Sequence, residues 1–111
     1  MNENPIWTLA TAQDLCIRLE ELAIPQKLHV ALGGSCLIRG ESIKDVDVFF
    51  YPHKSTDAPP IDVVHGVLVK AGLQLTGQFN STYGAKDTKF DSHWVDNDKR
   101  VDVFYVNAAN L

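Results

Sequence analysis

The sequence predicts an α/β domain of the α+β kind, in which a mixed β-sheet of about five strands is backed on one face by two helices. Three observations support this prediction. Two segments have apolar residues at helical spacing, short β-rich runs alternate apolar and polar residues, and the chain order is helix, strand, strand, helix, strand, strand, strand. The 111 residues match a single domain over 1–111, since autonomous cores need on the order of 50 to 150 residues.

Each predicted helix has one apolar stripe. Over residues 11–23 apolar side chains recur every three or four positions, Thr11 and Asp14 resemble a capping pair, and Pro25 follows the end. Residues 61–71 repeat the stripe, with Lys70 near the end and Gly72 just past it, which is typical of a helix end. Both stripes need an apolar surface to cover, and the sheet provides it.

The strands are predicted from β-rich runs between turn residues. An apolar run at 28–32 enters the turn Gly33-Gly34-Ser35, and residues 36–39 leave room for only a turn or two of helix. The last two runs form a hairpin across 96–99, and residues 80–87 form a loop. The predicted strands are 28–32, 45–51, 73–79, 89–95 and 100–106.

The composition is that of a globular protein with an acidic balance. With 10 Lys and Arg against 14 Asp and Glu, the net charge is −4, which argues against sequence-independent nucleic-acid binding. No uncharged stretch approaches the roughly 20 residues that span a bilayer, and the first residues do not resemble a signal peptide. Cys16 and Cys36 lack CxxC spacing, so we expect free thiols, a cytoplasmic protein and no membrane partner.

Three aspartates occupy a repeated strand pattern. Residues i and i+2 of a strand point to one face about 6.6 Å apart, so Asp45 and Asp47 share the face opposite the valines. The pattern Val-Asp-Val-Phe occurs at 46–49 and again at 101–104, where Asp102 has the same place. If the two strands are neighbours with their valines toward the helices, the three carboxylates converge on the open face. Clustered carboxylates repel one another and favour a hard cation such as Mg²⁺.

The turn Gly33-Gly34-Ser35 precedes the first two aspartates. Glycines let the backbone approach an anion, and N–H groups at a helix start can donate to phosphate oxygens, as can the Ser35 hydroxyl. A positive φ at Gly34 is compatible with this role. Nine residues separate Ser35 from Asp45, enough for a helical turn and a return into the adjacent strand. The sequence therefore predicts a phosphate cradle beside the carboxylates.

Taken in order, these motifs resemble the signature of the DNA polymerase beta-like nucleotidyltransferase superfamily. They are Gly33-Gly34-Ser35, nine intervening residues, Asp45-Val46-Asp47, and a later strand with Asp102. The resemblance extends over about residues 28–106. In size the chain is similar to the minimal nucleotidyltransferases, including the antitoxin-type members that pair with HEPN-domain toxins.

The resemblance implies an enzyme that moves a nucleoside monophosphate from an NTP to an acceptor hydroxyl and releases pyrophosphate. It also implies the metal ligands: Asp45 and Asp47 for two Mg²⁺ ions, and Asp102 for the metal that activates the acceptor hydroxyl. Asp102 would also draw off the hydroxyl proton. The three aspartates are thus the expected catalytic residues, and a protein or an RNA is the expected acceptor.

The resemblance further implies a nucleotide site at the glycine turn. Gly34 and Ser35 would hold the β and γ phosphates, with Gly33 part of the same site. The nearest basic residues, Arg39 and Lys44, are the expected triphosphate contacts. Weaker candidates are Lys86, Lys89 and Arg100.

Two departures from the superfamily pattern leave alternatives open. Many members have a basic residue close after the serine, whereas here it is displaced to Arg39, and no helical acceptor-binding domain follows residue 106. The acceptor is then a partner macromolecule, the site is completed by oligomerisation, or catalysis is lost. The main alternative is a catalytically inactive binding module that acts on a protein partner, as an antitoxin or antagonist. A metal-dependent phosphohydrolase is a more distant one.

The other chemically active side chains give weaker signals. The histidines lack metal-ligand spacing such as HExxH and are expected to be structural or exposed: His29, His53, His65 and His93. Phe49, Tyr51 and Phe104 share the predicted face of the aspartates, where they are expected to cover the sheet rather than to stack on a base.

Overall fold

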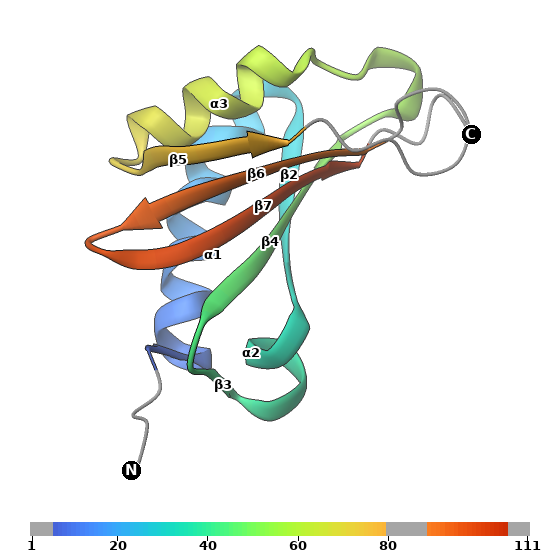
Figure 1. The fold of residues 1–111 in the computed structure, drawn as a ribbon. Helices are drawn as coiled ribbons and strands as arrows, with labels where there is room; N and C mark the ends of the chain where they lie inside the picture. Colours follow the sequence, from blue (N-terminus) through green and yellow to red (C-terminus); the bar gives the residue numbers. More distant parts are fainter. Residues whose placement is uncertain (1–5, 80–88, 107–111) are drawn as a thin grey trace, which may run out of the picture.

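The computed structural model describes residues 6–79 and 89–106, and its centre is a five-stranded mixed sheet (Figure 1). The central pair, β4 and β7, is parallel, and the other neighbours are antiparallel. In spatial order the strands are β2 (Leu28–Gly33), β4 (Asp45–Pro52), β7 (Lys99–Val106), β6 (Lys89–Asp96) and β5 (Gln74–Phe79). The predicted mixed sheet of five strands is confirmed.

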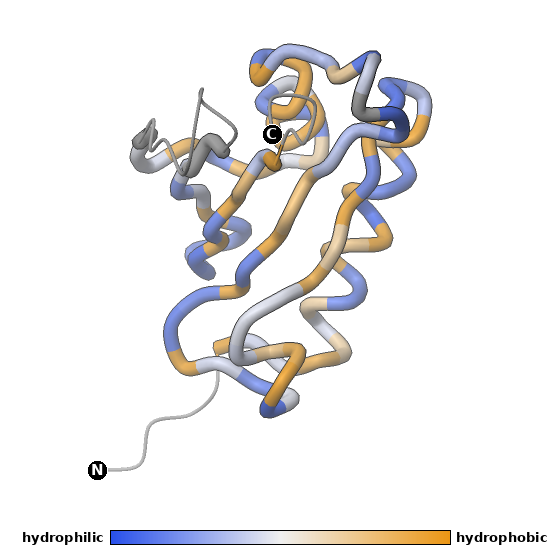
Figure 2. The backbone as a smooth tube through the Cα atoms, turned by 90° about the vertical axis from the view of Figure 1, so that its right-hand side faces the viewer, coloured by the Kyte–Doolittle hydropathy of each residue, from blue (hydrophilic) through white to orange (hydrophobic). Residues whose placement is uncertain are grey.

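Two helices, α1 (Leu9–Ala23) and α3 (Ile61–Lys70), cover one face of this sheet, as the fold prediction stated (Figure 1). Hydrophilic and hydrophobic residues alternate along the helices and strands, so one side of each element joins the core (Figure 2). The helices contribute Ala12, Leu15, Leu19, Ala23, Val64, Val67 and Leu68, and the central strands contribute Val46, Val48, Phe50, Val101, Val103 and Tyr105. The opposite face of β4 and β7 is left open.

Helix α1 begins earlier than the sequence analysis predicted. Its N-cap is Thr8, whose side chain accepts from the Thr11 amide, while the Thr11 side chain accepts from the Thr8 amide. The predicted capping pair of Thr11 and Asp14 is therefore wrong. Thr11 lies at the third helical position of a reciprocal capping box, a role usually taken by Glu or Gln.

The structure adds short elements that the sequence patterns did not indicate. Strands β1 (Trp7–Thr8) and β3 (Glu41–Ser42) form a separate two-stranded antiparallel sheet beside α2 (Gly34–Arg39) (Figure 1). Two short 3-10 helices are η1 (Ile24–Gln26) and η2 (Ser55–Asp57). Across residues 6–79 and 89–106, no helix combines the length and the apolar character needed to cross a membrane.

The β5–β6–β7 meander departs from the simple alternation. A bulge between Leu75 and Gly77 shifts the pairing of β5 with β6. Leu75 pairs with the buried Trp94 before the bulge, but β5 is an edge strand, and Leu75 is 46% exposed rather than buried. The predicted hairpin of β6 and β7 is present, with Asn97 and Asp98 at positive φ as a two-residue turn requires. The predicted loop at 80–87, with Lys86, lies outside the described residues, as does the Lys89 side chain.

The other edge strand, β2, has its outer backbone partly covered by α1. Oε2 of Glu20 accepts the amide N–H of Val30 at 2.8 Å, and Oε1 lies 2.8 Å from Nδ1 of His29. The other ring nitrogen of His29 lies 2.8 Å from Nδ1 of His53. A chain of polar contacts therefore joins α1 to β2 and to the end of β4, and two of the four histidines are structural and surface groups, as expected.

Candidate metal and nucleotide site

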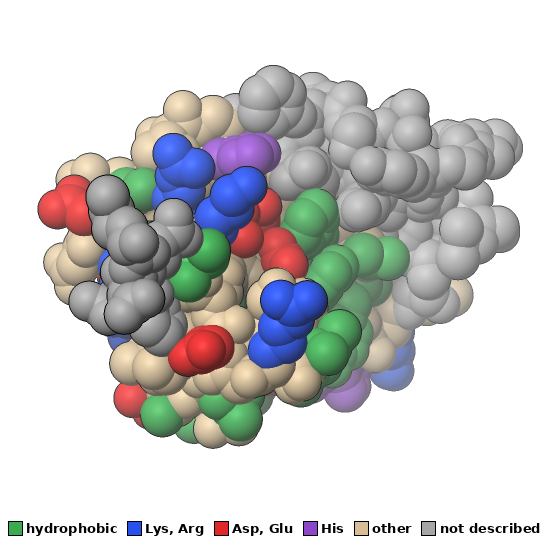
Figure 3. All heavy atoms as spheres, turned by 60° about the horizontal axis from the view of Figure 1, so that its bottom comes forward, with side chains coloured by type: hydrophobic (Ala, Val, Ile, Leu, Met, Phe, Trp, Pro, Cys, Tyr) green, Lys and Arg blue, Asp and Glu red, His purple; other side chains and the backbone are tan. Residues whose placement is uncertain are grey.

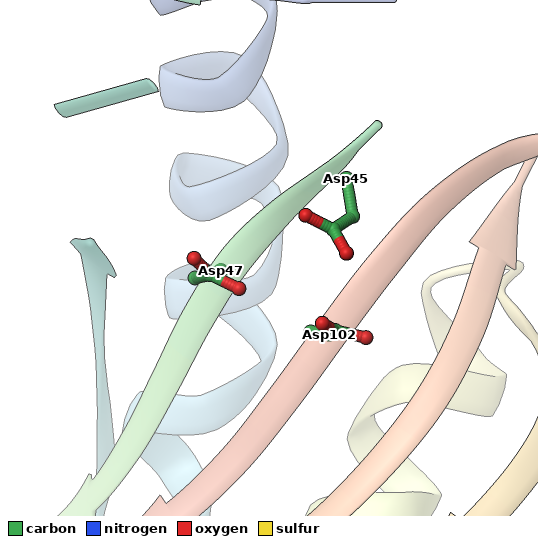
Figure 4. Close-up of side chains that lie close together, drawn as sticks. All are labelled: Asp45, Asp47 and Asp102. Carbon is green, nitrogen blue, oxygen red and sulfur yellow. The ribbon is translucent and has the colours of Figure 1, made fainter. Parts of the chain in front are cut away.

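The three aspartates converge on the open face of the sheet (Figure 4). Asp45 and Asp47 project from β4, and Asp102 projects from β7 as the direct register partner of Asp47. One carboxylate oxygen from each can be chosen so that all three lie within 4.8 Å of one another. The parallel pairing of the two Val-Asp-Val-Phe segments produces this cluster, because it aligns Val46 with Val101 on the core side.

The cluster stores electrostatic repulsion. Burial and the neighbouring Asp45, which acts through a hydrogen bond and through its charge, together raise the pKa of Asp102 to about 6. Asp47 acts in the same direction, while His93 opposes the shift in pKa. Without a cation Asp102 therefore keeps its proton up to about pH 6. Half-buried oxygens with this charge excess are a suitable donor set for a hard divalent cation.

The two glycines are required by the carboxylate and the ring beside them. Gly34 has a φ of +67°, and a Cβ there would lie 1.9 Å from Oδ2 of Asp47. Gly33 has an extended backbone, and a Cβ there would lie 2.5 Å from Cε2 of Phe49. The absence of both side chains lets β2 and the start of α2 approach the metal-ligand candidates closely.

A small hollow of about 250 Å³ lies on the α2 side of the cluster. It contains three of the predicted nucleotide-binding residues, Ser35, Arg39 and Lys44, together with Asp45. Arg39 and Lys44 make no ion pair among the described residues. Figure 3 shows the carboxylates in the centre of this face with Lys and Arg side chains on more than one side. The hollow therefore combines hydroxyl and cationic groups beside the acidic cluster.

A larger hollow of about 530 Å³ lies on the other side of the cluster, over β5, β6 and β7. Two members of the cluster, Asp45 and Asp102, line this hollow on one side. Arg100 and His93 also line it and add a positive and an ionisable group. This volume is in the range of small-molecule pockets. Because Asp45 lines both hollows, the cluster lies at their junction.

His93 is a site residue that the sequence analysis did not identify. It is the cross-strand partner of Asp102, and its Nδ1 lies 3.2 Å from Oδ1 of Asp102. The signal was present in the sequence, because counting outward from a two-residue turn at Asn97 and Asp98 pairs residue 93 with residue 102.

Aromatic residues border the cluster at its other end. Phe49 and Phe104 stack on each other with centroids 4.9 Å apart, two residues beyond Asp47 and Asp102 on the same strands. They cover the open face of the central strands, as expected.

Burial raises the pKa of Cys16 to about 11, and burial with the charges of Asp47 and Asp45 raises the pKa of Cys36. Neither thiol is therefore suited to act as a nucleophile.

Comparison with known proteins supports the fold. No protein-family model matches the chain, and no curated protein matches its sequence. Among solved structures 121 chains match. One is a polymerase beta from Leishmania infantum, described as a ternary gap complex, with a TM-score of 0.55 and 16% identity. The match covers 88% of this chain but 37% of that chain, so this chain spans little more than a third of the polymerase. The chain therefore has a polymerase beta-like fold.

Proposed function

We propose that the protein is a Mg²⁺-dependent nucleotidyltransferase, which transfers a nucleoside monophosphate from an NTP to an acceptor hydroxyl and releases pyrophosphate. The observation that carries this proposal is the position of three converging carboxylates between two hollows of different size. Such a reaction needs one compartment for a triphosphate and another for an acceptor. The polymerase beta-like fold is consistent with this chemistry.

Asp45, Asp47 and Asp102 are the proposed metal ligands. Their oxygens are close together, and the raised pKa of Asp102 reflects a need for positive charge in the cluster. Bound Mg²⁺ would neutralise charge on the entering and leaving oxygens of the transfer. Two ions would fit this role, since paired sites in phosphoryl transfer hold metals roughly 3.5–4 Å apart.

The small hollow is the proposed triphosphate site. The Ser35 hydroxyl can donate to a phosphate oxygen, and Arg39 and Lys44 can neutralise the triphosphate charge. Gly33 and Gly34 let the backbone of α2 lie close to this anion without a side chain between them. Charge placed in this way stabilises the pyrophosphate as it leaves.

The larger hollow is the proposed acceptor site. Asp102 lies at its border, where its carboxylate can accept the proton of the attacking hydroxyl. The hydroxyl oxygen then bonds to the α-phosphorus as the bond to the bridging oxygen breaks and pyrophosphate departs. We propose a protein or an RNA as the molecule that presents this hydroxyl.

Labelled NTPs, Mg²⁺ and candidate protein and RNA acceptors test this proposal. Transfer should fall by about a hundredfold or more in Asp45→Asn and Asp47→Asn, because each removes a charge from the cluster. Asp14→Asn removes one negative charge from an exposed position on α1 and should leave transfer unchanged. Transfer that survives in both cluster variants would refute the site assignment.

A second candidate function is a partner-binding module without catalysis, such as an antitoxin that pairs with a toxin. The specific observation is a group of exposed aliphatic side chains beside the small hollow: Leu37, Ile38 and Ile43, with Ile38 82% exposed. Isothermal calorimetry separates the two functions. A pure interaction module should show no Mg²⁺-dependent NTP binding and no response to Asp102→Ala.

A further inference from the structure

The His93 side chain is built into the acidic cluster from a third strand. It lies on β6, directly opposite Asp102 on β7, and shares the open face with it. Its Nδ1 is 3.2 Å from Oδ1 of Asp102, with the His93 side chain 43% exposed and the Asp102 side chain 21% exposed. Two strands thus supply the carboxylates, and the neighbouring strand supplies a ring in contact with one of them.

The ionised state of a metal-binding Asp102 determines which of the two side chains is the donor. A carboxylate that ligates a metal is ionised, and an ionised carboxylate only accepts hydrogen bonds. In the contact with Asp102, at 3.2 Å, Nδ1 of His93 can then act only as the N–H donor. The contact engages Oδ1, which leaves the other oxygen and the remaining lone pairs of the carboxylate for a cation.

Asp102 needs such a restraint more than the other two aspartates do. It is the single ligand from β7, and it faces Asp45 and Asp47, whose charges raise the pKa of Asp102. Repulsion by these two carboxylates favours rotation of the Asp102 side chain away from the cluster. The His93 bond opposes that turn, in the manner by which outer hydrogen bonds orient metal ligands.

We propose that His93 is a positioning residue, whose Nδ1–H holds Asp102 in the orientation that joins Asp45 and Asp47 around a divalent cation. This inference rests on the proposed metal-dependent function. Residues that orient ligands typically change metal affinity by about 10- to 100-fold when they are lost. The effect is therefore expected on the binding of the metal itself, before any turnover.

Titration with Mn²⁺ as a spectroscopic substitute for Mg²⁺ tests the proposal without an acceptor. His93→Leu should weaken Mn²⁺ binding by about 10- to 100-fold. His93→Asn places an amide N–H near the position of Nδ1 and should restore most of the affinity. His53→Leu is the matched control, because it removes an exposed histidine beyond the far end of β4, and it should bind Mn²⁺ as the parent does.

The outcomes separate this inference from the proposed function. If the parent binds Mn²⁺ and His93→Leu binds it equally well, the positioning role is overturned while the metal site stands. If His93→Asn is as weak as His93→Leu although both unfold at the parent temperature, the donor role of Nδ1 is overturned. If the parent binds no Mn²⁺, both the metal site and the inference are overturned.

Discussion

Replacing Gly34 by Ala adds a single Cβ at the point where β2 meets α2, and we expect it to abolish metal binding. The φ of +67° at this position costs an L-residue about 1–2 kcal/mol. The new carbon would lie 1.9 Å from Oδ2 of Asp47, whereas ordinary contact begins at 3.4 Å, so that oxygen must retreat by about 1.5 Å. Metal sites tolerate ligand distances wrong by only about 0.2 Å. A displacement of this size should reduce Mn²⁺ affinity by about a hundredfold or more.

Gly40 provides the matched control for this variant. It also has a positive φ, +82°, but among the described residues no atom outside the local backbone lies within 4 Å of the position of its Cβ. Gly40→Ala therefore has a similar backbone cost and does not displace a ligand. Both variants should unfold at lower temperature, by about 4–8 °C for each kcal/mol lost in a domain of this size.

The assay combines thermal unfolding in EDTA with calorimetric titration by Mn²⁺. We expect the unfolding temperatures of the two alanine variants to fall together and their Mn²⁺ affinities to separate. Equal affinities in Gly34→Ala and Gly40→Ala would refute the reasoning that the glycine turn exists to make room for Asp47. Loss of affinity in both variants would refute it as well, because backbone strain alone would then explain the effect.

Three further predictions concern stability. Burial and the adjacent Asp45 raise the pKa of Asp102 from 3.8 to about 6, so ionising it costs the metal-free fold up to about 3 kcal/mol above pH 6. Asp102→Asn should therefore raise the unfolding temperature in EDTA at pH 7.5, and the gain should vanish as the pH falls below 3.8, where the carboxyl is protonated in both states. Burial lowers the pKa of His65, with Asp62 opposing, so the parent should lose stability as the pH falls below 6.5. Urea unfolding at two pH values should show a smaller loss of stability in His65→Leu, and an unchanged loss would contradict a partly buried, neutral His65 ring. Thr8→Ala removes the N-cap of α1 and should cost about 1 kcal/mol in the same assay, more than Asp14→Ala does.

The central part of the fold could be predicted because its signals are local. The alternation of valine and aspartate in β4 and β7 reports a strand with one buried face, and the repeated pattern suggested that Asp47 and Asp102 are partners. Stripes on α1 and α3 likewise report the face that each helix buries. These patterns follow from the periods of helix and strand, which a sequence displays directly.

The features that were missed depend on pairing across the chain. The contact of His93 with Asp102 requires the exact hairpin register, and the alternation of apolar and polar residues in β5 does not reveal the bulge after Leu75. Thr8 is the N-cap of α1, and Thr11, which the sequence pattern indicated as the capping residue, instead completes the capping box from the third helical position. In each case a side chain has its role because of a partner that local periodicity does not specify.

The Glu20 carboxylate has a consequence for how this protein meets other copies of itself. An edge strand with free N–H groups is a template on which a strand of another molecule can pair, which leads to aggregation. At Val30 that template position is already filled, and the same carboxylate also contacts His29. An incoming strand would have to displace the Glu20 carboxylate from both the Val30 amide and the His29 ring. Helix α1 therefore blocks strand addition at β2, the edge strand opposite β5.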